Sequence, residues 1–132
     1  MNELYEKLLH ETYLLTGQGE LEKFKTYLAD DASWTEATGF PYAGTYVGPD
    51  EIVKNVHERL GSEWNNYSAE DISYGFNGNK VFVYGKYSGE FKATGKSFIA
   101  DFVHVYEFNS DNKVQKFTQI VDSQTVVEAT EK

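Results

Sequence analysis

The first half of the chain carries apolar residues at the spacing of amphipathic helices. One apolar stripe covers residues 4–15 and stops at Gly17, and a shorter stripe covers residues 21–28. A third helix is expected to begin at Pro49, which suits the first helical position, and to end at Gly61. The pattern therefore predicts three helices in the N-terminal half.

From Tyr67 onward the spacing changes to the alternation that is typical of β-strands. Turn residues at 77–79, 94–95 and 110–112 separate four strands, and the last strand is expected to end at Ser123. Helices followed by an antiparallel meander predict an α+β fold, in which the three helices cover one face of a bent sheet. Only residues 128–132 are expected to form a frayed tail.

Composition limits the partners of this chain. Its 132 residues are the length of one domain, which we expect to span residues 1–132. The 12 basic and 21 acidic residues give a net charge of -9, which disfavours binding to nucleic acid and to anionic membrane surfaces. Cysteine is absent, so thiolate chemistry and disulfides are excluded. Because the chain starts without an apolar leader and has no run of membrane-spanning length, we expect a cytoplasmic protein.

Residues 28–52 join a helix end, a strand with a carboxylate, a loop with glycine and proline, and a new helix start. They contain an Ala-Asp-Asp step at residues 29–31, the acidic Glu36 and an Ala-Gly-Thr-Tyr-x-Gly run at residues 43–48. This order resembles the SnoaL-like and ketosteroid isomerase-like branch of the nuclear transport factor 2-like superfamily. The resemblance extends over residues 4–127. It implies a cystatin-like cone whose helices and strongly bent, mostly antiparallel sheet enclose an apolar pocket, the alternative being an unrelated α+β sandwich with a filled core.

Trp34 and Glu36 share one face of a short strand expected over residues 33–37, because side chains alternate along a strand. The resemblance places Glu36 where ketosteroid isomerases have their catalytic carboxylate base, and Trp34 in the pocket wall. A carboxyl group in an apolar cavity has its pKa raised toward values that suit a general base. The alternative is a solvated carboxylate at the pocket rim.

The long strand expected over residues 97–109 places Phe102 and His104 on one face. The resemblance puts His104 where the isomerases carry a protonated aspartic acid that binds the substrate oxygen. Imidazole can also donate a hydrogen bond to a developing enolate, so His104 is the second catalytic candidate. The alternative is a buried histidine satisfied by Tyr106, Gln119 or water.

The last strand places Phe117, Gln119 and Val121 on one face, which the resemblance implies is the pocket face. We therefore expect these three side chains to bind the substrate together with Trp34 and Phe102. An amide among apolar walls can orient a ligand carbonyl or hydroxyl group, or it can hold a neighbouring side chain in a buried network.

The first helix departs from the isomerase pattern. Ketosteroid isomerases use a tyrosine there as the main donor to the substrate oxygen, and the alignment puts Thr12 at that position. The next residue, Tyr13, is about 100° further around the helix and is expected to point elsewhere. Steroid isomerase activity is therefore not predicted.

Other side chains suggest neither a metal nor a cofactor. His10, His57 and His104 lie in different elements without the spacing of metal ligands, and no phosphate-binding glycine loop occurs. Asp101 and Asp122 are secondary acidic candidates, although strand alternation turns both away from the pocket face.

The expected function is that of a small-molecule pocket protein. One hypothesis is a cofactor-independent isomerase, cyclase or lyase that acts on a neutral, apolar carbonyl compound by general acid–base catalysis. The other is a non-catalytic module that binds an apolar or lipid-like ligand. The outer sheet face carries Ile99, Val103, Val105 and Ile120, which predicts a homodimer through this face.

Overall fold

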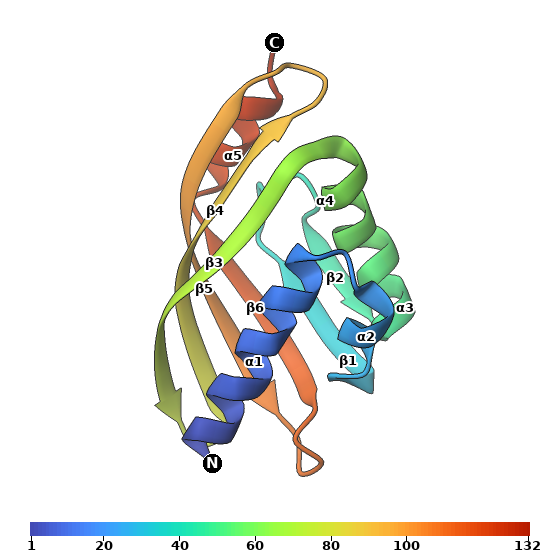
Figure 1. Cartoon of the computed structure of the whole chain (residues 1–132), viewed down its shortest axis with the longest axis vertical. Coiled ribbons are helices and arrows are strands. Elements are labelled where there is room, and N and C mark those ends of the chain that lie inside the picture. The colour runs from blue at the N-terminus through green and yellow to red at the C-terminus, as the bar shows by residue number, and fades with distance from the viewer.

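A curled sheet of six strands organises the structure, a computed structural model that describes residues 1–132 (Figure 1). The helical segments are α1 (Asn2–Gly17), α2 (Leu21–Lys25), α3 (Pro49–Ile52), the π-helical turn η1 (Val53–His57), α4 (Glu58–Glu63) and α5 (Ser123–Thr130). The strands are β1 (Leu28–Glu36), β2 (Gly44–Val47), β3 (Trp64–Asn77), β4 (Lys80–Phe91), β5 (Ser97–Phe108) and β6 (Val114–Val121).

The strands lie in the order β2-β1-β6-β5-β4-β3. The pairing of β1 with β6 is parallel, and all other neighbours are antiparallel. Figure 1 shows α1, α2 and the α3–α4 helix on one side of the curled sheet, with the two chain ends far apart. The predicted α+β architecture with a bent, mostly antiparallel sheet is thus confirmed. None of the helices combines the length and the apolar character that a membrane crossing needs.

Alternating burial along the meander explains why the sheet curls over one core. Every second residue from Phe98 to Phe108 of β5 is buried, and the residues between them are wholly or partly exposed. The register pairs His104 of β5 with Val83 of β4 and Gln119 of β6, which continues the same inner face across three strands. This inner face faces the helices and carries the side chains of the candidate site.

A glycine allows the sheet to bend sharply beside this face. A Cβ atom built at Gly85 would lie 2.1 Å from the Glu70 carbonyl oxygen and 2.3 Å from the Phe102 ring. No other residue type fits there without moving the backbone. The adjacent strand β3 has a bulge between Asp71 and Ser73, which adds local twist at the same level of the sheet.

Two boundaries differ from the sequence prediction because strand pairing overrides a helical pattern. The helix expected over residues 21–28 ends at Lys25, and β1 starts at Leu28 instead of Ser33. Leu28 pairs with Val114, so the short apolar run joins the sheet. Such a run suits a helix or a strand equally well by periodicity alone.

The C-terminal segment forms a fourth helical unit, which extends to Thr130 and so into the tail that was expected to fray from residue 128. Asp122 caps α5, since its carboxylate accepts hydrogen bonds from the Thr125 amide at 3.3 Å and the Thr125 hydroxyl at 2.6 Å. Val126 and Ala129 of this helix are buried. The third predicted helix also runs past its expected end at Gly61, because α4 continues to Glu63.

Candidate functional site

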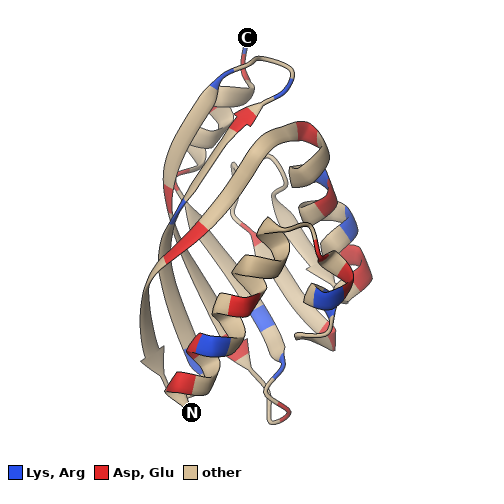
Figure 2. Ribbon diagram, in the orientation of Figure 1, with Lys and Arg blue, Asp and Glu red and all other residues tan.

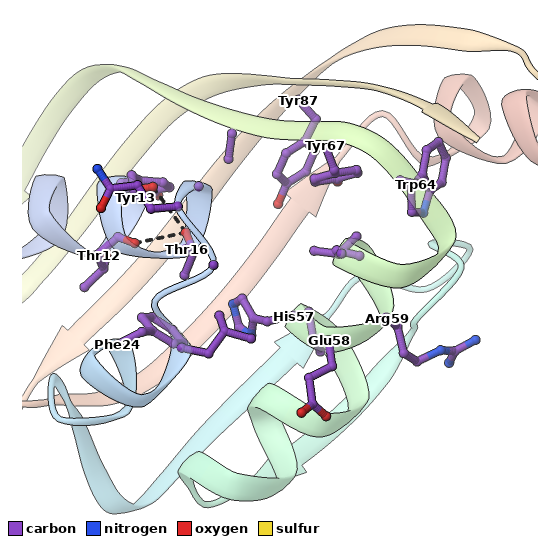
Figure 3. A pocket seen from close by; sticks show the side chains of 18 of the residues that line it. Thr12, Tyr13, Thr16, Phe24, His57, Glu58, Arg59, Trp64, Tyr67 and Tyr87 are labelled. Atoms are coloured by element: carbon purple, nitrogen blue, oxygen red, sulfur yellow. Dashed lines mark hydrogen bonds between the residues drawn. The ribbon is translucent and has the colours of Figure 1, made fainter. Parts of the chain in front are cut away.

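A cavity of about 770 Å³ lies between the helices and the inner face of the sheet. Side chains from α1, α2, the α3–α4 helix and the sheet meet there, as Figure 3 shows. Its wall is rich in aromatic rings: Tyr13, Phe24, Trp34, Trp64, Tyr67, Tyr87, Tyr106 and Phe117. No three His, Asp or Glu side chains converge in a way that could hold a metal ion.

Four buried polar side-chain atoms have no hydrogen-bond partner within the protein, and all four belong to residues that line this cavity. They are Trp34 Nε1, Glu36 Oε2, His57 Nδ1 and the Tyr67 hydroxyl oxygen. A buried polar group without a partner costs about 1–3 kcal/mol. The groups are therefore free to bond to a molecule that enters the cavity, and their concentration there marks it as the candidate site.

Glu36 stands at the end of β1, where strand alternation turns it to the same side as Trp34. Only 4% of Glu36 is exposed. Burial raises the pKa of Glu36 to about 8, and the nearby Trp34 side chain opposes this rise to a smaller extent. Near neutral pH the group can therefore exist in both protonation states, which suits a proton donor or acceptor.

The raised pKa of Glu36 predicts a specific dependence of stability on pH. As pH increases from about 4.5 to about 8, the unfolded chain releases this proton while the folded protein keeps it. The free energy of unfolding should fall by about 1.4 kcal/mol per pH unit from this group. Glu36→Gln removes the effect. Denaturant unfolding of both proteins across this range should therefore show that the free energy of unfolding of the variant increases, relative to that of the wild type, by that amount per pH unit. A constant difference between the two proteins would contradict a raised pKa.

His104 is held between two tyrosines. Its Nδ1 atom lies 2.6 Å from the Tyr13 hydroxyl oxygen, and its Nε2 atom bonds to the Tyr87 hydroxyl. Burial lowers the pKa of His104 well below its ordinary value, so the ring is neutral. Because both ring nitrogens are already bonded, His104 can act on a ligand only through the two phenols.

The hydrogen bonds continue beyond both tyrosines. The Tyr106 hydroxyl donates to the Tyr13 hydroxyl at 2.9 Å. On the other side, Gln119 Nε2 donates to the Tyr87 hydroxyl at 2.9 Å, and Gln119 Oε1 accepts from the Ala37 amide at 2.9 Å. One connected network thus runs from Tyr106 on β5 to the main chain after β1.

The structure divides the predicted site residues into two groups. Trp34, Glu36, His104 and Phe117 line the cavity, whereas Phe102, Gln119 and Val121 do not. Phe102 lies behind the lining and stacks on His104 with ring centroids 3.9 Å apart. Gln119 stands behind Tyr87, and Val121 is at the end of β6 opposite Phe102. Strand alternation identifies the inner face correctly, but it cannot tell which part of that face the cavity reaches.

The prediction that Tyr13 points away from the pocket is wrong. Both residues line the cavity, and the Tyr13 hydroxyl contacts His104. The Thr12 hydroxyl instead donates to the Leu9 carbonyl at 2.6 Å within its own helix. A cavity of this width meets more than one side of α1, so two successive residues can reach it.

Sequence reasoning missed His57 and Tyr67, which irregular backbone directs into the cavity. His57 is the last residue of the π-helical turn η1, whose wider winding shifts side chains around the axis. Its ring packs against Phe24 and Trp34 with centroids 4.6 Å and 5.4 Å away, and burial lowers its pKa to about 4. Tyr67 follows Asn66, whose φ of 54° accompanies a bulge in β3.

Apart from Glu36, the Asp, Glu, Lys and Arg residues that line the cavity are Glu58 and Arg59. Figure 2 shows charged residues along the helices and at several positions of the strands, and in Figure 3 the ends of Glu58 and Arg59 point away from the interior. Arg59 is the only Lys or Arg among the lining residues. Its Nε atom lies 3.0 Å from a Glu63 carboxylate oxygen, and its guanidinium stacks on Tyr42 at 4.3 Å. The single cation of the lining is therefore already paired with a carboxylate.

The secondary acidic candidates lie outside the cavity. Asp101 is exposed on the outer sheet face, where it accepts a hydrogen bond from Tyr84 at 2.8 Å and pairs with Lys86 at 3.6 Å. Asp122 caps α5, as described above. Both therefore have structural partners away from the aromatic wall.

Comparisons with known proteins agree with this architecture. The SnoaL-like domain family matches residues 9–117. A crystal structure of an NTF2-like protein from Burkholderia thailandensis has 34% sequence identity and a TM-score of 0.91, covering 97% of this chain and 98% of that one. No curated protein matches the sequence.

Two more distant structures contain small molecules. TerC, co-crystallised with polyporic acid, has 18% identity and a TM-score of 0.85 over 97% of this chain and 98% of its own. A protein from Catenulispora acidiphila with a ketosteroid isomerase-like fold, in complex with trimethylamine, has 12% identity and a TM-score of 0.81, over 92% and 90% of the two chains. At such identities the likeness shows the fold alone.

Proposed function

Because this chain belongs to the SnoaL-like domain family, we propose that its cavity binds a neutral carbonyl compound and moves a proton on it without a cofactor. The reaction class is that of an isomerase, cyclase or lyase. The observation that carries this proposal is the set of unpartnered polar atoms, Glu36 among them, in a single aromatic cavity. We also infer that the three N-terminal helices enclose the ligand against the sheet.

The lining indicates what the ligand must offer. An apolar body suits the aromatic walls, but a purely apolar molecule would leave the Trp34, Glu36 and Tyr67 polar atoms without partners. A ligand with carbonyl or hydroxyl oxygens satisfies them. A neutral ligand is favoured because Arg59 is engaged with Glu63 and the net charge is -9.

In this mechanism Glu36 transfers the proton. Its pKa near 8 lets the carboxylate accept a proton from carbon and return it at another position near neutral pH. The negative charge that develops on the substrate oxygen needs a hydrogen-bond donor. The Tyr13 and Tyr87 phenols, which are bonded to His104, supply one. His104 is then a positioning residue, because neither ring nitrogen is free to reach the substrate.

Deuterium exchange into a panel of model ketones tests this function. The protein is incubated in D₂O with neutral aryl and alicyclic ketones, and mass spectrometry measures deuterium next to the carbonyl group. We expect at least one panel member to exchange faster with the wild-type protein than with Glu36→Gln. A ligand that binds in the cavity without any exchange would instead assign this site to the non-catalytic binding module.

We propose that two chains pair through the outer face of the sheet. Phe82, Tyr84, Ile99 and Ile120 are exposed there by 38%, 38%, 67% and 57%. Val103 lies between Tyr84 and Ile120 in the strand register, so the apolar surface is continuous across β4, β5 and β6. Such a surface is unfavourable in water unless it is covered.

Light scattering at micromolar concentration should therefore give the mass of a dimer. Ile120→Lys should shift the mass toward the monomer by placing a cation in the apolar face. The matched control is Leu14→Lys, which changes an apolar residue on α1 that is 50% exposed, against 57% for Ile120, and should leave the dimer intact. A monomer mass for the unmodified protein would reject the pairing.

A further inference from the structure

The hydrogen-bond network around His104 contains one more proton than its internal bonds use. Three bonds join Tyr106 to Tyr13, Tyr13 to His104, and His104 to Tyr87. Three phenol protons and the single proton of a neutral imidazole make four. One phenol O–H therefore has no acceptor inside the network. The three tyrosines all line the cavity, so the surplus proton is directed there.

Gln119 is the reason why this surplus exists. A backbone N–H can only donate, so the Gln119 atom that faces the Ala37 amide must be the carbonyl oxygen. The other end of the side chain is then the NH₂ group, which supplies its own proton to the Tyr87 oxygen. If an acceptor stood in place of this NH₂ group, it would take the Tyr87 proton, and every phenol proton would then have an acceptor.

The tautomer of His104 decides which tyrosine keeps the free proton. If Nδ1 carries the hydrogen, Tyr87 donates to Nε2, and the surplus lies on Tyr13 or, with their bond reversed, on Tyr106. If Nε2 carries it, Tyr13 donates to Nδ1 and the surplus lies on Tyr87. The first tautomer allows two complete arrangements and the second allows one.

Polarisation of the hydroxyl groups also favours the Nδ1–H tautomer of His104. A hydroxyl that accepts a hydrogen bond becomes a better donor, and the bond that Tyr87 accepts from the Gln119 amide cannot reverse. The bond between the Tyr106 and Tyr13 hydroxyls can reverse, because either phenol is able to donate. Tyr87 is therefore a better hydrogen-bond donor to His104 than Tyr13 is.

We propose that Gln119 is a positioning residue that holds His104 as the Nδ1–H tautomer and thereby leaves a free phenol proton on the Tyr13 side of the cavity. The network then delivers a neutral donor to the ligand oxygen without a charged histidine. The identity of that oxygen rests on the function proposed above. The tautomer itself does not, so its test stands apart from any assay of turnover.

Nitrogen-15 NMR of histidine-labelled protein measures this tautomer directly, and His104→Asn assigns the signals among the three histidines. In the wild-type protein we expect Nδ1 of His104 to carry the hydrogen, which is the form that free neutral histidine populates less. In Gln119→Glu, once the new carboxylate is ionised, it accepts the Tyr87 proton. The hydrogen on His104 should then move to Nε2, and Tyr13 should donate to Nδ1.

In Gln119→Glu samples that also carry carbon-13 at glutamate, the side-chain carboxyl carbon of residue 119 is followed to mark its ionisation. Gln124→Glu, an exposed change on α5, is the matched control and should keep the wild-type His104 spectrum. The same His104 tautomer in the wild type and in ionised Gln119→Glu would overturn the proposal. A wild-type spectrum with the hydrogen on Nε2 would also overturn it, even if Gln119→Glu failed to fold. A purely structural role for Gln119 predicts no switch between tautomers.

Discussion

Glu36→Gln is expected to lower proton-transfer turnover by about 10²- to 10⁴-fold, the usual contribution of a general acid or base. The substitution keeps the size of the side chain and its capacity for hydrogen bonds, but an amide cannot accept the substrate proton. Ligand affinity should change little, because the cavity keeps its shape. The rate of deuterium exchange for an active ketone, measured at saturating concentration, gives the value.

The control for this experiment is Glu70→Gln, which alters an exposed carboxylate on β3 and should exchange like the wild type. The wild-type rate should also rise with pH and level off above about pH 8, as Glu36 loses its proton. Equal turnover by the wild type and Glu36→Gln would remove Glu36 from the mechanism and favour the binding module.

Phe117→Ala is expected to reduce the free energy of unfolding by about 3–5 kcal/mol, the range for a buried phenylalanine. Only 1% of Phe117 is exposed, and its ring stacks on Trp34 with centroids 3.7 Å apart. Because the same ring lines the cavity, ligand affinity should fall as well. Denaturant unfolding and ligand titration measure the two effects separately.

Phe108→Ala provides the matched comparison. Phe108 is also buried and stacks on Tyr5 at 4.2 Å, but it does not line the cavity. This variant should lose stability to a similar extent and bind ligand as the wild type does when both are folded. Equal binding losses in the two variants would show that affinity follows global stability rather than contact with the Phe117 ring.

Regular alternation made much of the inner sheet predictable from sequence. It placed Trp34 with Glu36 and correctly placed Phe102 with His104 on an inner face. It could not show that Phe102 would be covered by the His104 ring while Glu36 remained at the cavity. Depth within a face depends on how neighbouring side chains pack, and one strand's pattern contains no such information.

Irregular backbone explains the other omissions. His57 ends a π-helical turn and Tyr67 follows a left-handed residue in a bulge, and neither has a simple signal in the spacing of apolar positions. The helix that Asp122 caps was easier to predict from the sequence, since an aspartate followed three residues later by threonine is compatible with an N-cap. Its position at the expected end of a strand concealed that pattern.

The parallel pairing of β1 with β6 also has a consequence for how the site assembles. It joins Trp34 near one end of the chain to Phe117 near the other, whereas β3 to β6 pair with strands that follow one another. Closing that long loop costs more chain entropy than forming a hairpin. During synthesis on a ribosome, β1 lacks its parallel partner until β6 has emerged. The cavity around Glu36 is therefore incomplete through most of synthesis. The proton transfer proposed above therefore requires a chain that extends through β6, because a chain truncated before β6 lacks the surface against which Trp34 and its neighbouring carboxyl group are held.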